Sequence, residues 1–186
     1  MTILTRRAVL AGGSAAFLAA AGCANGISSR GSQSIDARVA STLDYLYGNY
    51  PSTQDLRDKA SGILVMPLIT QAGFGVGGSY GRGALLVDGT PIDYYSATTA
   101  NVGLQIGAQQ YAHVLFFMTD DALYDFRNSS GYTAGADIEY AVRDRGGNLS
   151  ATTTTSLTPV IGVVFGQAGL IAGATVAGTK YTRIIP

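Results

Sequence analysis

The sequence predicts an α+β fold in which N-terminal helices pack on a curved, mainly antiparallel, glycine-rich sheet of the sandwich or barrel type. Apolar residues recur at helical spacing chiefly in the first part of the chain. From residue 62 onward, short apolar and glycine-containing runs follow one another with turn residues between them. Helical patterns do not separate most of these runs, as they would in a parallel α/β sheet.

The first 22 residues are typical of a cleaved export signal. Arg6 and Arg7 precede an apolar run that is shorter than the about 20 residues of a membrane span. The paired arginines resemble the twin-arginine signal, and residues 20–23 resemble a bacterial lipobox, although leucine is usual at its first position. We expect an acyl anchor such as palmitate on Cys23 and a periplasmic location, at the outer membrane. The alternative is an incidental cysteine in a discarded peptide.

The predicted domains are a signal peptide over residues 1–22, a flexible tether over 23–34 and one folded domain over 35–186. The tether is rich in Ser, Gly, Asn and Gln. The folded part is long enough for its own core, in a chain with 47% hydrophobic residues. Removal of the signal leaves 10 basic and all 12 acidic side chains. This balance argues against nucleic-acid binding through a basic face.

Two helices are predicted ahead of the sheet. Ser34 can cap the first helix, whose apolar positions continue to about Gly48. Turn residues delimit the second helix at Pro51 and Gly62. Near the end of the first helix, three side chains suit either a membrane interface or, more commonly, packing on a sheet: Tyr45, Tyr47 and Tyr50.

Strands dominate after Gly62. The first group of predicted strands covers residues 63–69, 73–80, 84–87, 92–96, 102–109 and 114–118. Asp88 and Gly89 indicate a hairpin turn, and Thr119 can cap a short helix that reaches Phe126. The second group of predicted strands covers residues 134–142, 160–165, 170–176 and 180–184.

Glycines are concentrated between Gly73 and Gly83. Three of them fit the pattern G-x-G-x-x-G, but the residues after Gly78 indicate a strand, whereas a dinucleotide site requires a helix there. We therefore expect the glycines to bend a strand or to let another backbone approach closely.

Several motifs resemble the SYLF, or Ysc84-like, domain over about residues 35–186. The motifs cover residues 62–67, 72–78, 83–87, 117–123, 126–129 and 169–173. The resemblance implies a lipid-binding module. Eukaryotic members associate with phosphoinositide membranes and some with actin, whereas bacterial members look like exported lipoproteins. The lysines that the family often carries near residues 61, 71 and 168, and an acidic residue near 177, are absent here. Cations near the motifs that could contact a lipid headgroup are Lys59, Arg82, Lys180 and Arg183.

Residues suited to catalysis are few. His113, the single histidine, is expected at a strand edge or at the rim of the core and not as a base. Asp120 and Asp121 are explained by helix capping, whereas Asp137 and Glu139 would share one face of a strand. No His/Cys cluster is available for zinc. We expect no enzyme activity, metal or cofactor; a hydrolase that uses Asp137 and Glu139 is an alternative.

The sequence therefore favours a lipid-anchored envelope protein whose domain adsorbs to phospholipid membranes. The other interpretation is an envelope scaffold that holds another envelope protein through a strand edge or through the tyrosine-rich helix. Neither interpretation involves nucleic acid, and neither predicts an oligomeric state.

Overall fold

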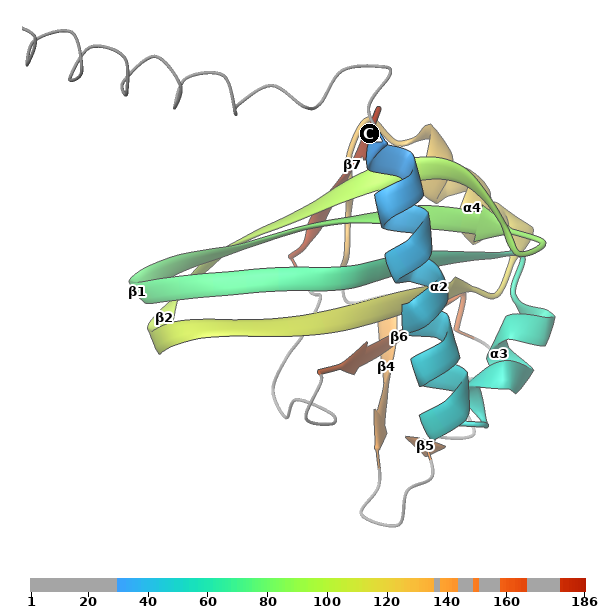
Figure 1. The fold of residues 1–186 in the computed structure, drawn as a ribbon, viewed down its shortest axis with the longest axis horizontal. Coiled ribbons are helices and arrows are strands. Elements are labelled where there is room, and N and C mark those ends of the chain that lie inside the picture. Colours follow the sequence, from blue (N-terminus) through green and yellow to red (C-terminus); the bar gives the residue numbers. More distant parts are fainter. Residues whose placement is uncertain (1–29, 136–137, 144–148, 151–157, 167–177) are drawn as a thin grey trace, which may run out of the picture.

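The computed structural model describes residues 30–135, 138–143, 149–150, 158–166 and 178–186. Its elements, in chain order, are α2 (Gly31–Asn49), α3 (Thr53–Lys59), β1 (Gly62–Val87), β2 (Thr90–Phe117), α4 (Asp120–Asn128), β3 (Tyr132–Thr133), β4 (Ile138–Arg143), β5 (Leu149–Ser150), β6 (Val160–Phe165) and β7 (Lys180–Ile184) (Figure 1). The predicted α+β class with a curved sheet is confirmed.

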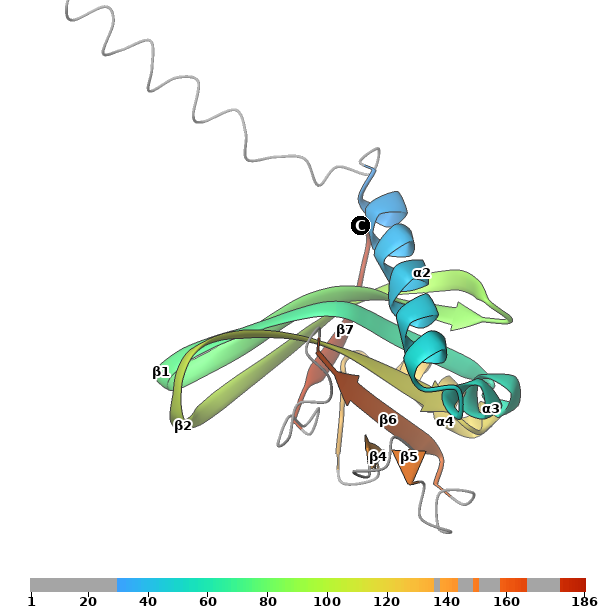
Figure 2. The same cartoon turned by 60° about the horizontal axis from the view of Figure 1, so that its bottom comes forward.

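β1 and β2 form one long antiparallel hairpin that bends back on itself, with both bends at the same end of the molecule (Figures 1 and 2). Asp88 and Gly89 close the hairpin with φ values of 50° and 74°, as a type I′ turn requires. The six strands predicted here are therefore two continuous ones. The glycines bend β1 without ending it, because its pairing with β2 continues on both sides of the bend.

The bent hairpin folds into two layers. The first layer contains the C-terminal half of β2, with which β6 pairs, and the second contains the N-terminal half of β2, with which β7 pairs. β3 continues the sheet beyond β7, whereas β4 lies parallel to β6. The described strands thus form a curved, mainly antiparallel sheet, as predicted. The predicted strand over residues 170–176 lies outside the described residues.

One core fills the space between the two layers, and a second lies between the sheet and α2. The inner core includes Leu64, Leu85, Leu115, Phe117 and Tyr181. α4 contributes Phe126, whose ring centroid lies 4.7 Å from that of Tyr95 and 4.8 Å from that of Phe117. The outer core includes Ile35, Val39, Leu46, Val65 and Val163.

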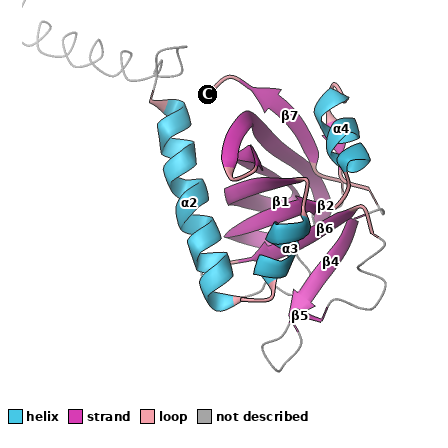
Figure 3. Cartoon of the chain, turned by 90° about the vertical axis from the view of Figure 1, so that its right-hand side faces the viewer, coloured by secondary structure: helices cyan, strands magenta, loops and turns pink. Residues whose placement is uncertain are grey.

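α2 runs along the outside of the sheet (Figure 3). It begins at Gly31, so Ser34 lies inside the helix and is not its N-cap; Arg30 occupies that position without a side-chain cap. At the other end, the Tyr45 ring stacks on Phe165 at 5.8 Å. Tyr50, just beyond α2, is buried in the outer core, and Tyr47 packs against that core. The three tyrosines therefore pack on the sheet, the commoner of the two uses considered. None of the described helices is both long and apolar enough to cross a membrane.

α4 begins as predicted, because Thr119 caps it. The backbone N–H of Ala122 donates a hydrogen bond to Thr119 Oγ1 over 3.2 Å. We expect Thr119→Ala to lower the free energy of unfolding by about 1 kcal/mol, and Thr119→Ser to retain most of it. Urea denaturation followed by circular dichroism measures both variants. Equal losses in the two variants would show that the hydroxyl is not what stabilises the helix.

Candidate functional site

The four cations that the resemblance indicated do not form one site. Lys59 ends α3, and Arg82 lies on β1. Lys180 and Arg183 lie on opposite faces of β7, because they are three positions apart along a strand. Of these four, only Arg183 forms an ion pair with a described residue. Cys23 lies outside the described residues, as does Asp137.

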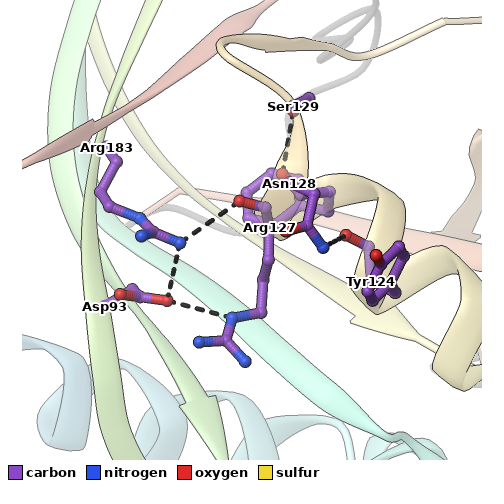
Figure 4. Close-up of polar contacts among 7 residues, drawn as sticks. Asp93, Tyr124, Arg127, Asn128, Ser129 and Arg183 are labelled. Atoms are coloured by element: carbon purple, nitrogen blue, oxygen red, sulfur yellow. Dashed lines mark hydrogen bonds and ion pairs between the residues drawn. The ribbon is translucent and has the colours of Figure 1, made fainter.

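Arg183 belongs to a group that we name the Asp93 cluster, formed by Asp93 on β2, Arg127 at the end of α4 and Arg183 on β7 (Figure 4). Both arginines donate to the same oxygen of Asp93: Nε of Arg127 lies 3.1 Å from Oδ2, and Nη2 of Arg183 lies 3.2 Å from it. Nη2 of Arg183 also donates to the carbonyl oxygen of Arg127 over 3.3 Å. Two positive charges therefore share one negative charge.

The last turn of α4 positions Arg127. A cation is favourable there because the helix dipole places partial negative charge at the C-terminus. Two side-chain bonds satisfy carbonyl groups of the same turn: Asn128 Nδ2 donates to the Tyr124 carbonyl over 2.8 Å, and Ser129 Oγ donates to the Phe126 carbonyl over 2.9 Å (Figure 4). The side chain of Asp93 is 15% exposed, and those of Arg127 and Arg183 are 42% and 52% exposed. The carboxylate is thus largely enclosed while both guanidinium groups reach solvent.

Tyr95 lies next to the Asp93 cluster. Its side chain is buried, and it is paired with Arg183 across the β2–β7 ladder. Burial raises the pKa of the Tyr95 hydroxyl. The Arg183 guanidinium opposes this shift, because it lies within hydrogen-bond reach of the hydroxyl. Its alignment is too poor for a well-formed bond, so the buried hydroxyl has no well-aligned hydrogen-bond partner among the described residues.

Three exposed apolar side chains flank the Asp93 cluster in the sequence, and we name them the apolar rim: Ile92, Tyr124 and Ile185. Ile92 precedes Asp93 on β2, Tyr124 lies one helical turn before Arg127, and Ile185 follows Arg183 by two residues. Tyr124 is 67% exposed and Ile185 is 80% exposed. Cations beside exposed apolar groups are the combination by which protein surfaces bind the interface of a bilayer.

A separate groove of about 210 Å³ lies between α2 and the sheet. It is bordered by Tyr45 and Thr42 of α2, by Leu68 of β1 and by Phe165 of β6, and it shares no lining residue with the Asp93 cluster. No charged side chain lines it. This groove therefore offers apolar and neutral polar contacts but no cation that would pair with a phosphate.

His113 is a core residue, and the expectation that it lies at an edge or rim was wrong. Its side chain is buried between the layers, where Nε2 lies 2.8 Å from the Tyr181 hydroxyl. Burial lowers its pKa to about 3, so the imidazole is neutral near pH 7. The alternation of β2 explains the position: Tyr111, His113 and Leu115 share the inner face.

The sequence interpretation missed Asp93, Arg127 and Tyr95. Arg127 lay within a recognised motif, over residues 126–129, but nothing local distinguished it from a solvated arginine. Asp93 and Arg183 are brought together by the β2–β7 register, which pairs Tyr94 with Ile184. That register depends on contacts between distant residues.

Comparison with curated proteins gives no match. Comparison with protein families gives a match that contains Arg127 and Arg183 and begins after Asp93 and Tyr95. Residues 98–183 match the Ysc84 family, described as Las17-binding protein actin regulator.

Proposed function

We propose that the protein binds phospholipid membranes without catalysing a reaction, and that the Asp93 cluster and the apolar rim contact the bilayer. The observation that carries the proposal is a pair of solvent-reaching arginines, held on one carboxylate, with three exposed apolar side chains close to the cluster in the sequence. Arginine attracts the phosphate groups of lipids, and isoleucine and tyrosine gain free energy when they enter the interfacial region.

The proposal includes an acyl anchor on Cys23 at the periplasmic side of the cell envelope. A diacyl or triacyl addition at Cys23 would hold the protein stably at the membrane. The Asp93 cluster and the apolar rim would then be the part of the folded domain that contacts the bilayer. Intact mass of the mature protein tests the anchor, because acylation adds a defined mass to Cys23.

A non-catalytic role is part of the same proposal. It is supported by the burial of His113, which removes an exposed base, and by the position of Asp120 and Asp121 in the first turn of α4, where they stabilise the helix. The second candidate function is an envelope scaffold. The description of the matched family as a Las17-binding protein favours this alternative, because it refers to binding of another protein.

Vesicle co-sedimentation tests the membrane function. The full chain with Cys23→Ser is compared with the same chain carrying Ile92→Ser, Tyr124→Ser and Ile185→Ser. On phosphatidylcholine vesicles that contain phosphatidylglycerol, we expect the triple variant to bind about tenfold more weakly, which corresponds to about 1.4 kcal/mol. The loss follows from apolar area that no longer leaves water.

Tyr80→Ser is the matched control, because Tyr80 is 54% exposed on β1 and lies outside the apolar rim. We expect this variant to bind as the parent does. Equal, negligible binding of the parent to anionic and neutral vesicles would exclude the membrane function. Capture of an envelope protein by that same parent would then favour the scaffold.

A further inference from the structure

We infer that Arg127 and Arg183 clamp the phosphate group of a phospholipid, with Asp93 holding the two guanidinium groups side by side. The inference rests on the proposed function for the source of the phosphate. It goes beyond that function because it assigns one group on the lipid, and the residues that bind it, to a defined place in the fold.

Each arginine of the clamp has more N–H donors than it uses in its hydrogen bonds to described residues. A guanidinium group carries five N–H donors in one plane. Arg127 uses Nε toward Asp93, and its terminal nitrogens have no partner among the described residues. Arg183 uses Nη2 toward Asp93 and toward the Arg127 carbonyl. The remaining donors can form the paired N–H···O bonds by which arginine binds phosphate.

Asp93 sets the spacing of the two arginines. Because both donating nitrogens contact one oxygen, at 3.1 Å and 3.2 Å, they are separated by no more than the sum of those distances. A tetrahedral phosphate can therefore offer a different oxygen to each guanidinium group. The enclosed carboxylate keeps the arginines together in the absence of a ligand, which reduces the entropy lost on binding.

The charge of the cluster fits a phosphodiester. Two guanidinium groups and one carboxylate leave one positive charge, and a phosphodiester carries one negative charge. The bound group would thus complete the charge balance of the site. The partial exposure of both arginines allows the phosphate to approach from solvent.

The Tyr95 hydroxyl is the second observation that points to a ligand. A buried polar group without a partner costs about 1–3 kcal/mol, so phenylalanine would be expected at a purely structural position. The hydroxyl lies beside Arg183, whose side chain is 52% exposed. A small shift of this guanidinium group that keeps its bond to Asp93 would let the hydroxyl donate to a phosphate oxygen.

The apolar rim favours a lipid as the source, because its three exposed side chains are close to the cluster residues in the sequence. Inorganic phosphate would contact the donors but gain nothing from Ile92, Tyr124 and Ile185. A headgroup in a bilayer brings its phosphate to the arginines and an apolar interface to these three side chains. Both sources share the phosphate chemistry, and the experiment below separates them.

The test uses the full chain with Cys23→Ser and charge-preserving substitutions. Arg127→Lys with Arg183→Lys keeps both charges but removes the planar fork of donors. We expect this pair to weaken binding to vesicles of phosphatidylcholine and phosphatidylglycerol by about tenfold. Lys180→Gln is the control, because it removes a charge from the opposite face of β7; it should change binding less than about twofold.

Tyr95→Phe provides a second readout that does not require changing an arginine. We expect the free energy of unfolding to stay constant or rise, because the unpartnered hydroxyl is removed, while vesicle binding weakens several-fold. A hydroxyl with only a structural role would give the reverse, a less stable protein with unchanged binding. This variant keeps the inference testable if the double lysine variant fails to fold.

The outcomes separate the inference from the proposed function. Unchanged vesicle binding in the double lysine variant, or in a folded Tyr95→Phe, would overturn the clamp and leave the membrane function standing. Phosphorus-31 NMR line broadening with inorganic phosphate forms the second arm. Broadening that depends on Arg127 and Arg183, in a protein that ignores vesicles, would support the phosphate site but overturn both the lipid source and the membrane function.

Discussion

Gly83→Ala is expected to remove a large part of the stability of the fold. A Cβ atom at this position would overlap the carbonyl oxygen of Val65 and would lie 2.6 Å from Met66 Sδ. The two halves of β1 meet here backbone to backbone, so neither can move without disturbing its pairing with β2. Overpacking of this kind costs about 3 kcal/mol or more, against a typical total of about 5–15 kcal/mol. The urea midpoint and the yield of soluble protein measure the loss.

Gly48→Ala is the matched control for Gly83→Ala. Gly48 lies in α2, and a Cβ atom there would meet nothing within 4 Å. We expect this substitution to raise the free energy of unfolding by about 0.5–1 kcal/mol, because alanine favours helix more than glycine does. If Gly83→Ala proved as harmless as Gly48→Ala, the close approach of the two halves of β1 would be wrong.

Local signals were sufficient for much of the secondary structure. Asp88 and Gly89 supply the positive φ values of the turn, and Thr119 caps α4 with its own hydroxyl, so both could be predicted from neighbouring residues. The bounds of β6 and β7 also agree with the prediction. The continuity of β1 could not be predicted, because a cluster of glycines resembles a break unless the partner strand is known.

The candidate site depends on contacts over long separations in sequence. Asp93 lies 34 residues from Arg127 and 90 residues from Arg183. Family motifs marked Lys180 and Arg183 together, but the alternation of a strand puts their side chains on opposite faces. Of the three charged residues in the cluster, proximity to a motif in the sequence therefore identified Arg183 as a candidate, but not Asp93 or Arg127.

Acid is expected to destabilise the protein through His113. The pKa of this side chain is about 3 in the folded state, because burial penalises its charged form, and about 6.5 in the unfolded state. Below pH 6.5 the unfolded chain therefore binds a proton that the folded protein does not. The stabilisation is complete above pH 6.5 and is lost as the pH falls toward 3. The slope approaches about 1.4 kcal/mol per pH unit, so we expect a loss of about 2 kcal/mol between pH 6.5 and pH 5.

His113→Gln isolates this contribution, because glutamine can offer a polar atom to the Tyr181 hydroxyl but does not titrate. The variant is expected to start from a lower stability at pH 7, since its side chain differs in shape from imidazole in a packed core. Its stability should then change little between pH 7 and pH 5, a window that lies above most carboxylate pKa values. Urea denaturation of both proteins across this window measures the difference in slope. Parallel pH dependences would mean that the folded protein accepts a proton on His113, and would contradict its enclosure between the two layers.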